Sequence, residues 1–285
     1  MSQEIPRYKL LDNDQIRISS LVERHVPKYF PTHRHQYYEI VIITSCVEGN
    51  FSHSIDFESY PLLGGRVYFI APGQAHEWNV KTYDGEYKGY LVTFNEDFFL
   101  KGNKNLEAQL LKLFDPLDTE PYLEYEETKF HETFPTMNIL EDEYKKEASD
   151  YYLLRSLLET LIYYMSNLKG ESIHKGDMGC QRLVEARKYI EKHYKEERSA
   201  EFYARKMELS AKRLNEIFKE FLGETLTQVL HRRLLLEAKR ELITQSKTIQ
   251  VISDELGFEN ASYFSRFFKK HEGVSPTEFL KQTFK

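Results

Sequence analysis

Apolar and polar residues alternate along the first hundred residues in short runs of the kind that form β-strands. The runs are IRISSL from residue 16, YEIVIITSC from 38, FSHSIDF from 51, RVYFIA from 66 and KGYLVTF from 88. Turn-forming residues separate the runs, which is typical of a small barrel built from many short strands. The N-terminal part of the chain is therefore predicted to be a β-barrel.

The pattern then changes to helical spacing, which predicts helices over residues 105–114, 134–148 and 150–168. The third helix carries a continuous apolar stripe. Its members are Leu154, Leu157, Leu158, Leu161, Ile162, Met165 and Leu168. Such a stripe can pack against the chain's own barrel.

A polar, glycine-containing stretch, SNLKGESIHKGDMG from residue 166 to 179, follows this helix and is the best candidate for a linker. The predicted organisation is an N-terminal domain over 1–168, a linker over 169–179 and a C-terminal domain over 180–285. The predicted fold class is two-domain α+β, with a β-barrel and flanking helices followed by an all-α domain.

The C-terminal domain contains a repeat with an offset of fifty residues. Leu214, Ile217, Phe218, Lys219 and Gly223 recur as Phe264, Phe267, Phe268, Lys269 and Gly273. Because the pattern repeats position by position, the domain is predicted to contain a duplicated module.

Each copy of the module has the punctuation of two helices joined by a short turn. The first helix covers 200–206 in one copy and 249–256 in the other, and Ser210 or Asn260 then caps the second helix. In the later copy Gly257 can adopt the left-handed conformation that ends a helix, and Phe258 can fill the angle between the two helices. The sequence therefore predicts two helix-turn-helix motifs.

The second helix of each motif has one apolar face and one polar face. The outward residues are predicted to be Lys212, Arg213, Asn215, Glu216 and Lys219 in the first copy, and Ser262, Ser265, Arg266 and Lys269 in the second. Such side chains can form hydrogen bonds in a DNA major groove, although on a single helix they would more simply be a solvated surface. The duplication favours DNA recognition. A helix over 225–243, about 28 Å long at 1.5 Å per residue, could hold the two motifs about one DNA turn apart.

These motifs resemble the AraC/XylS family of bacterial transcription regulators. The resemblance covers about residues 180–281 and rests on RRLLLEAKREL from 232, ISDELGFENASYFSRFFKKHEGVSPTEFL from 252 and, more loosely, SAKRLNEIFKEFLGETL from 210. It implies base contacts from Lys212, Asn215 and Glu216 in the first motif and from Ala261, Ser262, Ser265 and Arg266 in the second, and phosphate contacts from Lys219 and Lys269. Arg213 and Asn260 complete the predicted DNA-binding set. The family resemblance also implies a homodimer that uses part of the apolar stripe.

The distribution of charge supports this division. Residues 178–285 contain 21 Lys and Arg against 16 Asp and Glu, a net charge of +5, whereas residues 1–177 carry −11. A basic segment suits contact with phosphate, and an acidic one is repelled by it. The sequence shows no membrane span or signal peptide, and Cys46 and Cys180 are too few for a disulfide framework, so we expect a cytoplasmic, nucleoid-associated protein.

Two short motifs in the barrel, HRHQYYE and PGQAH, resemble the cupin pattern over roughly residues 10–100. In one extended strand, His33, His35 and Glu39 would share a face, and a later strand would add His76. Metal-binding cupins use the matching four residues to hold a divalent transition metal. The alternative, as in AraC-type sensor domains, is that they line a ligand pocket.

The aromatic residues of the barrel are Tyr37, Tyr68, Phe69, Trp78 and Tyr90, which either stack on a sugar or another flat ligand or simply fill the core. We predict that the effector contacts His33, His35, Tyr37, Glu39, His76 and Trp78. No cofactor is expected, and the metal site is kept as the alternative.

The sequence thus predicts a transcription regulator, and no enzyme. Its partners would be double-stranded promoter DNA, a small-molecule effector such as a sugar, a second copy of the chain and, for an activator, RNA polymerase. Two alternatives remain open. One is a cupin metalloenzyme with an appended DNA-binding domain, and the other is a regulator whose barrel only mediates dimerisation.

Overall fold

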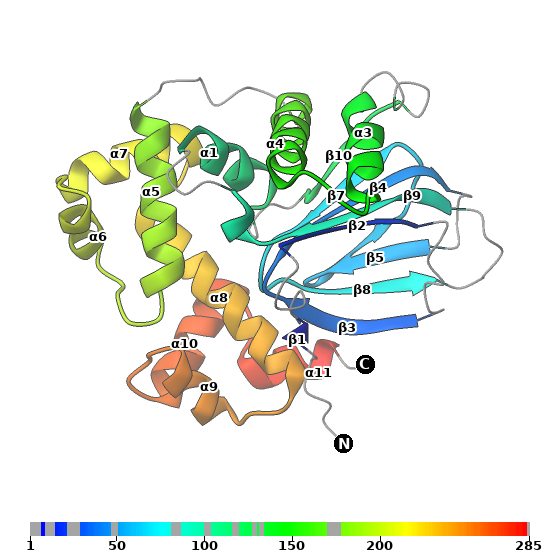
Figure 1. Cartoon of the computed structure of the whole chain (residues 1–285). Helices are drawn as coiled ribbons and strands as arrows, with labels where there is room; N and C mark the ends of the chain where they lie inside the picture. Colours follow the sequence, from blue (N-terminus) through cyan, green and yellow to red (C-terminus); the bar gives the residue numbers. More distant parts are fainter. Residues whose placement is uncertain are drawn as a thin grey trace. The chain divides into compact units, whose positions relative to one another are not determined.

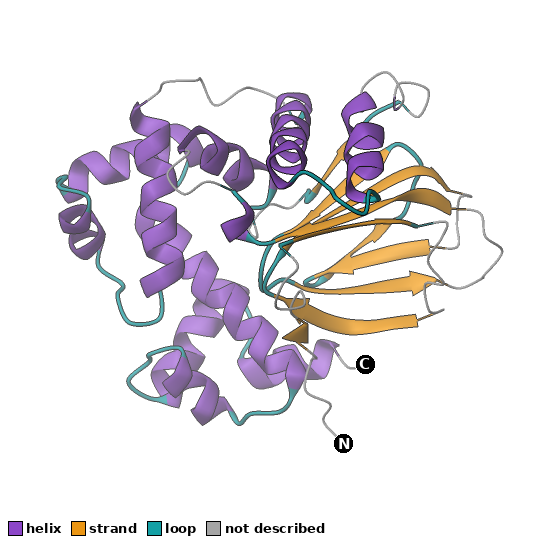
Figure 2. Cartoon of the chain, in the orientation of Figure 1, coloured by secondary structure: helices purple, strands orange, loops and turns teal. Residues whose placement is uncertain are grey.

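A computed structural model shows that the chain divides into two compact units, residues 5–173 and residues 174–285 together with 1–4 (Figure 1). The structure describes residues 7–8, 15–21, 29–46, 51–80, 87–99, 104–115, 120–126, 130, 134–169 and 178–283. Strands are confined to the first unit, and the described part of the second unit is helical (Figure 2). The predicted fold class is confirmed. Most of the predicted linker, residues 170–177, lies outside the described residues, and the helix that follows, α5, spans Met178–His193.

The first unit contains two five-stranded sheets. One has the order β1 (Arg7–Tyr8), β3 (Tyr29–His35), β8 (Ala75–Val80), β5 (Phe51–Ile55) and β6 (Glu58–Pro61). The other has the order β10 (Tyr122–Glu124), β7 (Arg66–Ile70), β4 (Tyr38–Cys46), β9 (Tyr87–Phe94) and β2 (Ile16–Ser20). All neighbouring strands are antiparallel except β1 and β3. The five strands predicted from alternation are therefore present.

The second sheet separates two apolar cores, because successive side chains of a strand point to opposite faces. Val41, Tyr68 and Trp78 belong to the core formed between the two sheets. Ile40, Ile42 and Phe69 belong to the core on the other face, which helices cover. Phe69 lies in this outer core and Tyr90 packs against it. The expectation that these two rings line the inside of the barrel is therefore wrong.

Helices α1 (Lys104–Leu113), α3 (Pro135–Tyr144) and α4 (Tyr151–Leu168) cover the outer core (Figure 1). A 3₁₀ turn, η1 (Glu96–Phe98), precedes α1. Most residues of the predicted apolar stripe on α4 are buried in this core. Leu154, Leu158, Leu161, Ile162 and Met165 are buried, Leu157 is half-buried and Leu168 is exposed. The stripe therefore serves the chain's own core and leaves little for a partner.

The second unit consists of seven described helices. They are α5 (Met178–His193), α6 (Ala200–Lys206), α7 (Ala211–Leu222), α8 (Leu226–Thr244), α9 (Ile249–Glu255), α10 (Ala261–Glu272) and α11 (Pro276–Thr283). The long helix predicted over 225–243 is α8, whose first turn is closed by a capping box between Thr225 and Gln228. No helix in the described ranges combines the length and hydrophobicity that a membrane-spanning segment requires.

Candidate functional site

The helix pairs α6–α7 and α9–α10 have the capping residues and turns predicted for two helix-turn-helix motifs. The side chains of Ser210 and Asn260 accept hydrogen bonds from the backbone amides of Arg213 (3.1 Å) and Tyr263 (2.9 Å), which cap α7 and α10. Gly223 and Gly273 end these helices in the left-handed conformation, with φ of 71° and 87°.

The turn between α9 and α10 is fixed by Gly257 and Phe258. Gly257 has a φ of 71°, as predicted. The ring of Phe258 is buried, with its centroid 5.2 Å from that of Phe264 and 5.1 Å from that of Phe267. The guanidinium of Arg198 covers the ring at 3.9 Å and donates a hydrogen bond to the carbonyl of Leu256. The motif is therefore held from the α5–α6 connection as well as from within.

The polar face of α10 is open to solvent. Phe264 and Phe268 are fully buried, whereas Asn260, Ser262, Arg266 and Lys269 are exposed and Ala261 and Ser265 are half-buried. Ser262 and Arg266 form no hydrogen bond with any residue that the structure describes. All the predicted DNA contacts of this helix therefore lie on or beside its solvent face.

More of the corresponding polar residues on α7 form contacts within the chain. Lys212, Arg213, Glu216 and Lys219 are exposed, but Arg213 and Glu216 form an ion pair at 3.2 Å. Asn215 is half-buried, donates to the carbonyl of Ala211 (3.1 Å) and accepts from the amide of Leu226 (3.1 Å). Its amide group thus ties α7 to the start of α8, an internal function that the sequence pattern did not indicate.

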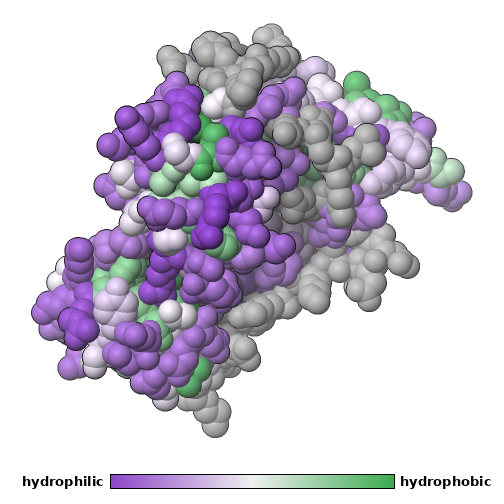
Figure 3. Space-filling model, turned by 90° about the vertical axis from the view of Figure 1, so that its left-hand side faces the viewer, coloured by the Kyte–Doolittle hydropathy of each residue, from purple (hydrophilic) through white to green (hydrophobic). Residues whose placement is uncertain are grey.

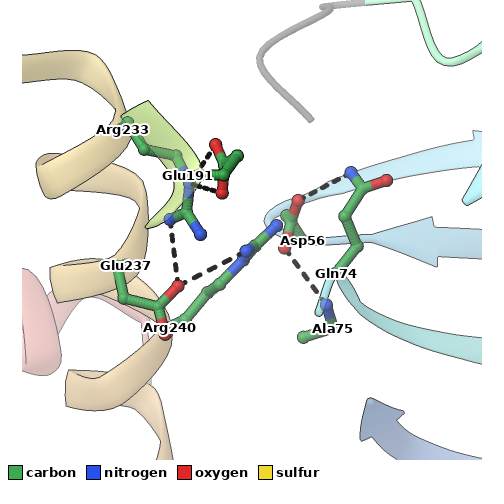
Figure 4. A network of polar contacts seen from close by, with 7 residues as sticks. All are labelled: Asp56, Gln74, Ala75, Glu191, Arg233, Glu237 and Arg240. Atoms are coloured by element: carbon green, nitrogen blue, oxygen red, sulfur yellow. Dashed lines mark hydrogen bonds and ion pairs between the residues drawn. The ribbon is translucent and has the colours of Figure 1, made fainter. Parts of the chain in front are cut away.

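An ion-pair network stabilises the junction of α5 and α8 (Figure 4). Arg233 donates to both oxygens of Glu191 at 2.9 and 3.0 Å, contacts Glu237 at 3.1 Å and covers the ring of Tyr194 at 4.3 Å. The charge of Arg233 is therefore paired with carboxylates of the same unit. Most of the coloured surface in Figure 3 is hydrophilic, with smaller hydrophobic areas.

A second polar cluster lies between the two sheets of the first unit. His33 and His35 on β3, Glu39 on β4, His53 on β5 and His76 on β8 are all at most 4% exposed. Strand pairing determines their positions. His76 lies opposite His33 on β3 and opposite Ile55 on β5, and His53 is two residues from Ile55 on the same strand. Burial of five polar side chains in an apolar core is costly unless they interact with one another or with a ligand.

The prediction that His33, His35 and Glu39 share one extended strand is wrong. The chain bends at Gln36 and Tyr37 and passes from β3 in one sheet to β4 in the other. His35 and Glu39 nevertheless meet across the interior, with Nε2 of His35 3.6 Å from Oε2 of Glu39. Their proximity results from the packing of two sheets and not from the period of one strand.

The bend also determines the environment of His35. Its Nδ1 lies 2.7 Å from the carbonyl oxygen of Tyr37, and the rings of these two residues are stacked at 3.9 Å. Trp78, the remaining predicted effector contact, is buried and stacks on His53 at 4.7 Å. The predicted effector contacts thus lie close to one another in the interior of the first unit.

His53 was missed in the sequence. Its Nε2 lies 3.0 Å from Nδ1 of His76, so one of these nitrogens donates to the other. The signal was present in FSHSIDF, where His53 alternates with Phe51 and Ile55 and so shares their apolar face.

Burial is the main cause that lowers the pKa of these imidazoles, with their mutual repulsion next. The pKa of His35 and that of His53 fall to about 3, and the pKa of His76 lies well below its usual value. His35, His53 and His76 are therefore neutral near pH 7, which leaves ring nitrogens with lone pairs between the two sheets.

The turn that presents His76 is held by Asp56 (Figure 4). Its carboxylate accepts hydrogen bonds from Nε2 of Gln74 (2.9 Å) and from the amide of Ala75 (3.2 Å). Gln74 in turn accepts from the amide of Ala71 at 2.7 Å. The PGQAH segment thus has a structural role beyond supplying its histidine.

Comparison with known proteins gives two family matches. Residues 20–125 match the AraC-like ligand binding domain, and residues 203–282 match a helix-turn-helix domain. The chain is 24% identical over 265 residues to the uncharacterized HTH-type transcriptional regulator YisR of Bacillus subtilis, covering 88% of each chain. It is 25% identical over 278 residues to the HTH-type transcriptional activator RhaR of Mannheimia succiniciproducens, covering 92% of this chain and 91% of the relative.

Among solved structures, ToxT from Vibrio cholerae aligns with 94% of this chain and 98% of its own, at 13% identity and a TM-score of 0.44, which is too distant to carry a functional assignment. The assignment comes from the two domain matches and from the curated relatives, which extend over both units. The chain therefore belongs to the AraC family of transcription regulators, with an AraC-like ligand-binding domain followed by a helix-turn-helix domain.

Proposed function

We propose that this protein regulates promoters in response to a small molecule that binds between the two sheets of its first unit. The observation that carries this proposal is the buried histidine and carboxylate cluster within a domain of the ligand-binding type. His33, His35, Tyr37, Glu39, His76 and Trp78 are the proposed effector contacts. Neutral imidazoles and a carboxylate suit a ligand with several hydroxyl groups, such as a sugar, and the aromatic rings suit its apolar faces.

The effector would act only through unequal affinity for two states of the protein. The test is to titrate sugars and other small polar ligands into the purified protein and to follow both occupancy and promoter binding. Operator affinity should change when the site is filled. An effector that occupies the barrel without altering operator binding or transcription would refute this part of the proposal.

For DNA recognition, we propose that α10 is the principal reading helix, through Ala261, Ser262, Ser265 and Arg266, while Lys269 and Lys219 contact phosphate. Asn260, Lys212, Arg213, Asn215 and Glu216 complete the proposed set. The exposed polar face of α10 supports this assignment. The internal hydrogen bonds of Asn215 make it the weakest member.

Two alanine variants separate base contacts from phosphate contacts. Arg266→Ala should weaken operator binding by about 1–3 kcal/mol and leave random DNA nearly unaffected, whereas Lys269→Ala should weaken both equally and reduce the salt dependence. Quantitative binding measurements on operator and scrambled duplexes at several salt concentrations provide the readout. Equal losses on both duplexes for Arg266→Ala would remove it from the reading set.

A homodimer is part of the proposal. With the α4 stripe buried, the remaining apolar surface on α3 and α4 includes Ile139, Tyr152, Leu153, Tyr164 and Leu168, of which Tyr152 is 69% exposed. Exposed apolar side chains that adjoin one another are typical of an interaction site, and these five residues are the candidates. Several relatives are named transcriptional activators, so we propose activation through RNA polymerase at the bacterial nucleoid.

The enzyme alternative is the weaker one, because the relatives that match most of the chain are named as regulators.

A further inference from the structure

The connection between α5 and α6, residues 194–199, is held by the first helix-turn-helix motif. The hydroxyl of Tyr203, a buried residue of α6, donates a hydrogen bond to the carbonyl of Glu197 (2.8 Å). Ser199 caps the first turn of α6 through its side chain. Glu197 and Ser199 precede and follow Arg198, so the first motif fixes the backbone from which the Arg198 side chain projects.

The side chain of Arg198, in contrast, contacts the second motif. Its guanidinium lies 3.9 Å from the centroid of the Phe258 ring and donates a hydrogen bond to the carbonyl of Leu256 (2.8 Å), the residue at the end of α9. A guanidinium is planar and weakly hydrated, so it can stack on a ring and donate in its own plane at the same time. One half-buried side chain thus joins the start of the first motif to the turn of the second.

The backbone of the connection lies equally close to this turn. A Cβ at Gly257 would clash with the carbonyl oxygen of Lys195, and Nη2 of Arg198 would lie 3.7 Å from the same Cβ. This spacing leaves no room for an intervening side chain. The contact between the α5–α6 connection and the second motif is therefore formed by backbone and side chain together.

A series of ring contacts extends from Arg198 to the proposed reading face of α10. The Phe258 ring packs on the buried Phe264, and its centroid lies 5.9 Å from that of Tyr263. The guanidinium of Arg266 lies 5.9 Å from the centroid of the Tyr263 ring. Because packed side chains cannot move independently, a displacement of Phe258 would move α10 and with it Arg266.

Helix α8 is the covalent link between the two motifs. Asn215 of α7 accepts a hydrogen bond from the amide of Leu226 in the first turn of α8, and the rings of His231 on α8 and Phe267 on α10 lie 5.4 Å apart. Two bodies that are joined by one helix can still rotate or bend relative to each other. A second attachment that bypasses the helix, such as the contact of Arg198, opposes this motion.

We infer that Arg198 is a positioning residue that fixes the orientation of α10 relative to α7 and thereby restricts the operator to one spacing between its two elements. This role of Arg198 in operator choice rests on the proposed reading of DNA by both helices. One inserted base pair moves the second element by about 3.4 Å and rotates it by about 36°. A fixed pair of helices cannot follow both elements after such a change, so the spacing becomes part of the specificity.

The test measures how strongly DNA binding depends on this spacing. The full-length protein selects its operator from random duplexes, and one base pair is then inserted or removed between the two elements. The wild type should bind the altered duplexes at least about tenfold more weakly. Arg198→Ala should bind the original duplex about 2- to 30-fold more weakly and lose much less on the altered ones. Lys192→Ala is the matched control, because it removes an equal charge from an exposed position on α5 and should retain the wild-type ratio.

The ratio of the affinities for the original and the altered duplexes separates positioning from stability. A smaller folded fraction lowers both affinities by the same factor and leaves their ratio unchanged. A wild-type ratio in Arg198→Ala would overturn the inference. Arg198→Lys keeps the charge but not the planar group, so it should behave as Arg198→Ala does. A wild-type ratio in the lysine variant would overturn the role given to the guanidinium.

A second measurement needs no DNA. Nitroxide labels are attached after Glu220→Cys and Lys270→Cys, with both native cysteines replaced by serine. These two positions are exposed and equivalent in the repeat, one on α7 and one on α10. The distribution of label-to-label distances, measured by pulsed electron paramagnetic resonance, should be broader in Arg198→Ala than in the wild type and in Lys192→Ala. Equal widths contradict the inference.

The two measurements distinguish failure of the inference from failure of the proposed function. A wild type that selects no duplex refutes the proposed reading of DNA, whereas the distance distributions still decide the role of Arg198. A broader distribution with an unchanged spacing ratio overturns the link to the operator. If Arg198→Ala does not fold, Phe258→Leu replaces it in both assays, since it removes the stacked ring and retains an apolar side chain.

Discussion

Replacing Gly257 with alanine tests whether the second helix-turn-helix motif depends on close backbone contact as well as on backbone conformation. A Cβ at this position would lie 2.1 Å from the carbonyl oxygen and 3.1 Å from the carbonyl carbon of Lys195. Gly223 offers a matched control, because its φ is also 71° but nothing lies within 4 Å of its Cβ position. The two variants share the conformational strain, and only one has the clash.

The expected magnitudes follow from these two contributions. The left-handed conformation costs an L-residue about 1–2 kcal/mol, so Gly223→Ala should lower the free energy of unfolding by about that amount. The clash in Gly257→Ala is with backbone and cannot be relieved by rotating a side chain. Arg198 also holds the opposing segment through its bond to Leu256, which opposes relaxation. Overpacking typically costs a further 1–3 kcal/mol, so Gly257→Ala should lose about 2–5 kcal/mol in total.

Urea denaturation followed by far-UV circular dichroism reports the unfolding of the helices of both units, most of which lie in the second. Trp78, the single tryptophan of the chain, lies on β8 in the other unit, so its fluorescence provides an internal control. Its transition should be the same in both variants. Equal losses of helical stability for Gly257→Ala and Gly223→Ala would show that the contact with Lys195 contributes nothing, and the reasoning would be refuted.

Three further predictions concern other parts of the molecule. Asn260→Ala removes the cap of α10 and should destabilise the helical unit by about 1 kcal/mol in the same denaturation assay, with unchanged stability as the contrary result. Tyr152→Glu combined with Ile139→Glu should convert a dimer to monomers in light scattering, since charge would replace exposed apolar surface; a dimer that persists would exclude this face. Burial, with repulsion from His271 next, lowers the pKa of His231 below 6.5, so the folded state disfavours its protonation. The stability should be complete above about pH 7 and decline as the pH falls through 6.5 towards the lower pKa of the folded state. His231→Gln should flatten this decline in melts that extend from about pH 7 to well below 6.5.

Much of the fold could be predicted because its signals are local. Alternation identified five strands of the first unit, and caps at Ser210 and Asn260 with glycine at 257 identified the two motifs of the second. The error over His35 and Glu39 arose where no local signal exists. The bend at Gln36 and Tyr37 contains neither glycine nor proline, and only the pairing of strands from two sheets determines it.

The candidate site was less predictable for the same reason. His53 has the alternation of a buried residue, but its value as a neighbour of His76 depends on the pairing of β5 with β8, which periodicity cannot reveal. The apolar stripe of α4 shows the opposite case. Its hydrophobicity was evident in the sequence, yet only the packed structure shows that the chain's own core buries it and that other apolar side chains of α3 and α4 stay exposed.

The two helix-turn-helix motifs are similar in sequence, but their polar residues differ in how many contacts they make within the chain. On α7, Asn215 holds the start of α8 and Arg213 is paired with Glu216, so reading DNA through either would first break an internal interaction. On α10, Ser262 and Arg266 have no hydrogen bond to give up among the described residues. Because a broken internal bond offsets a newly formed contact, the same base contact contributes less net affinity from α7 than from α10. We therefore predict that sequence discrimination resides mainly in α10 and that substitutions on α7 alter mainly the phosphate contacts.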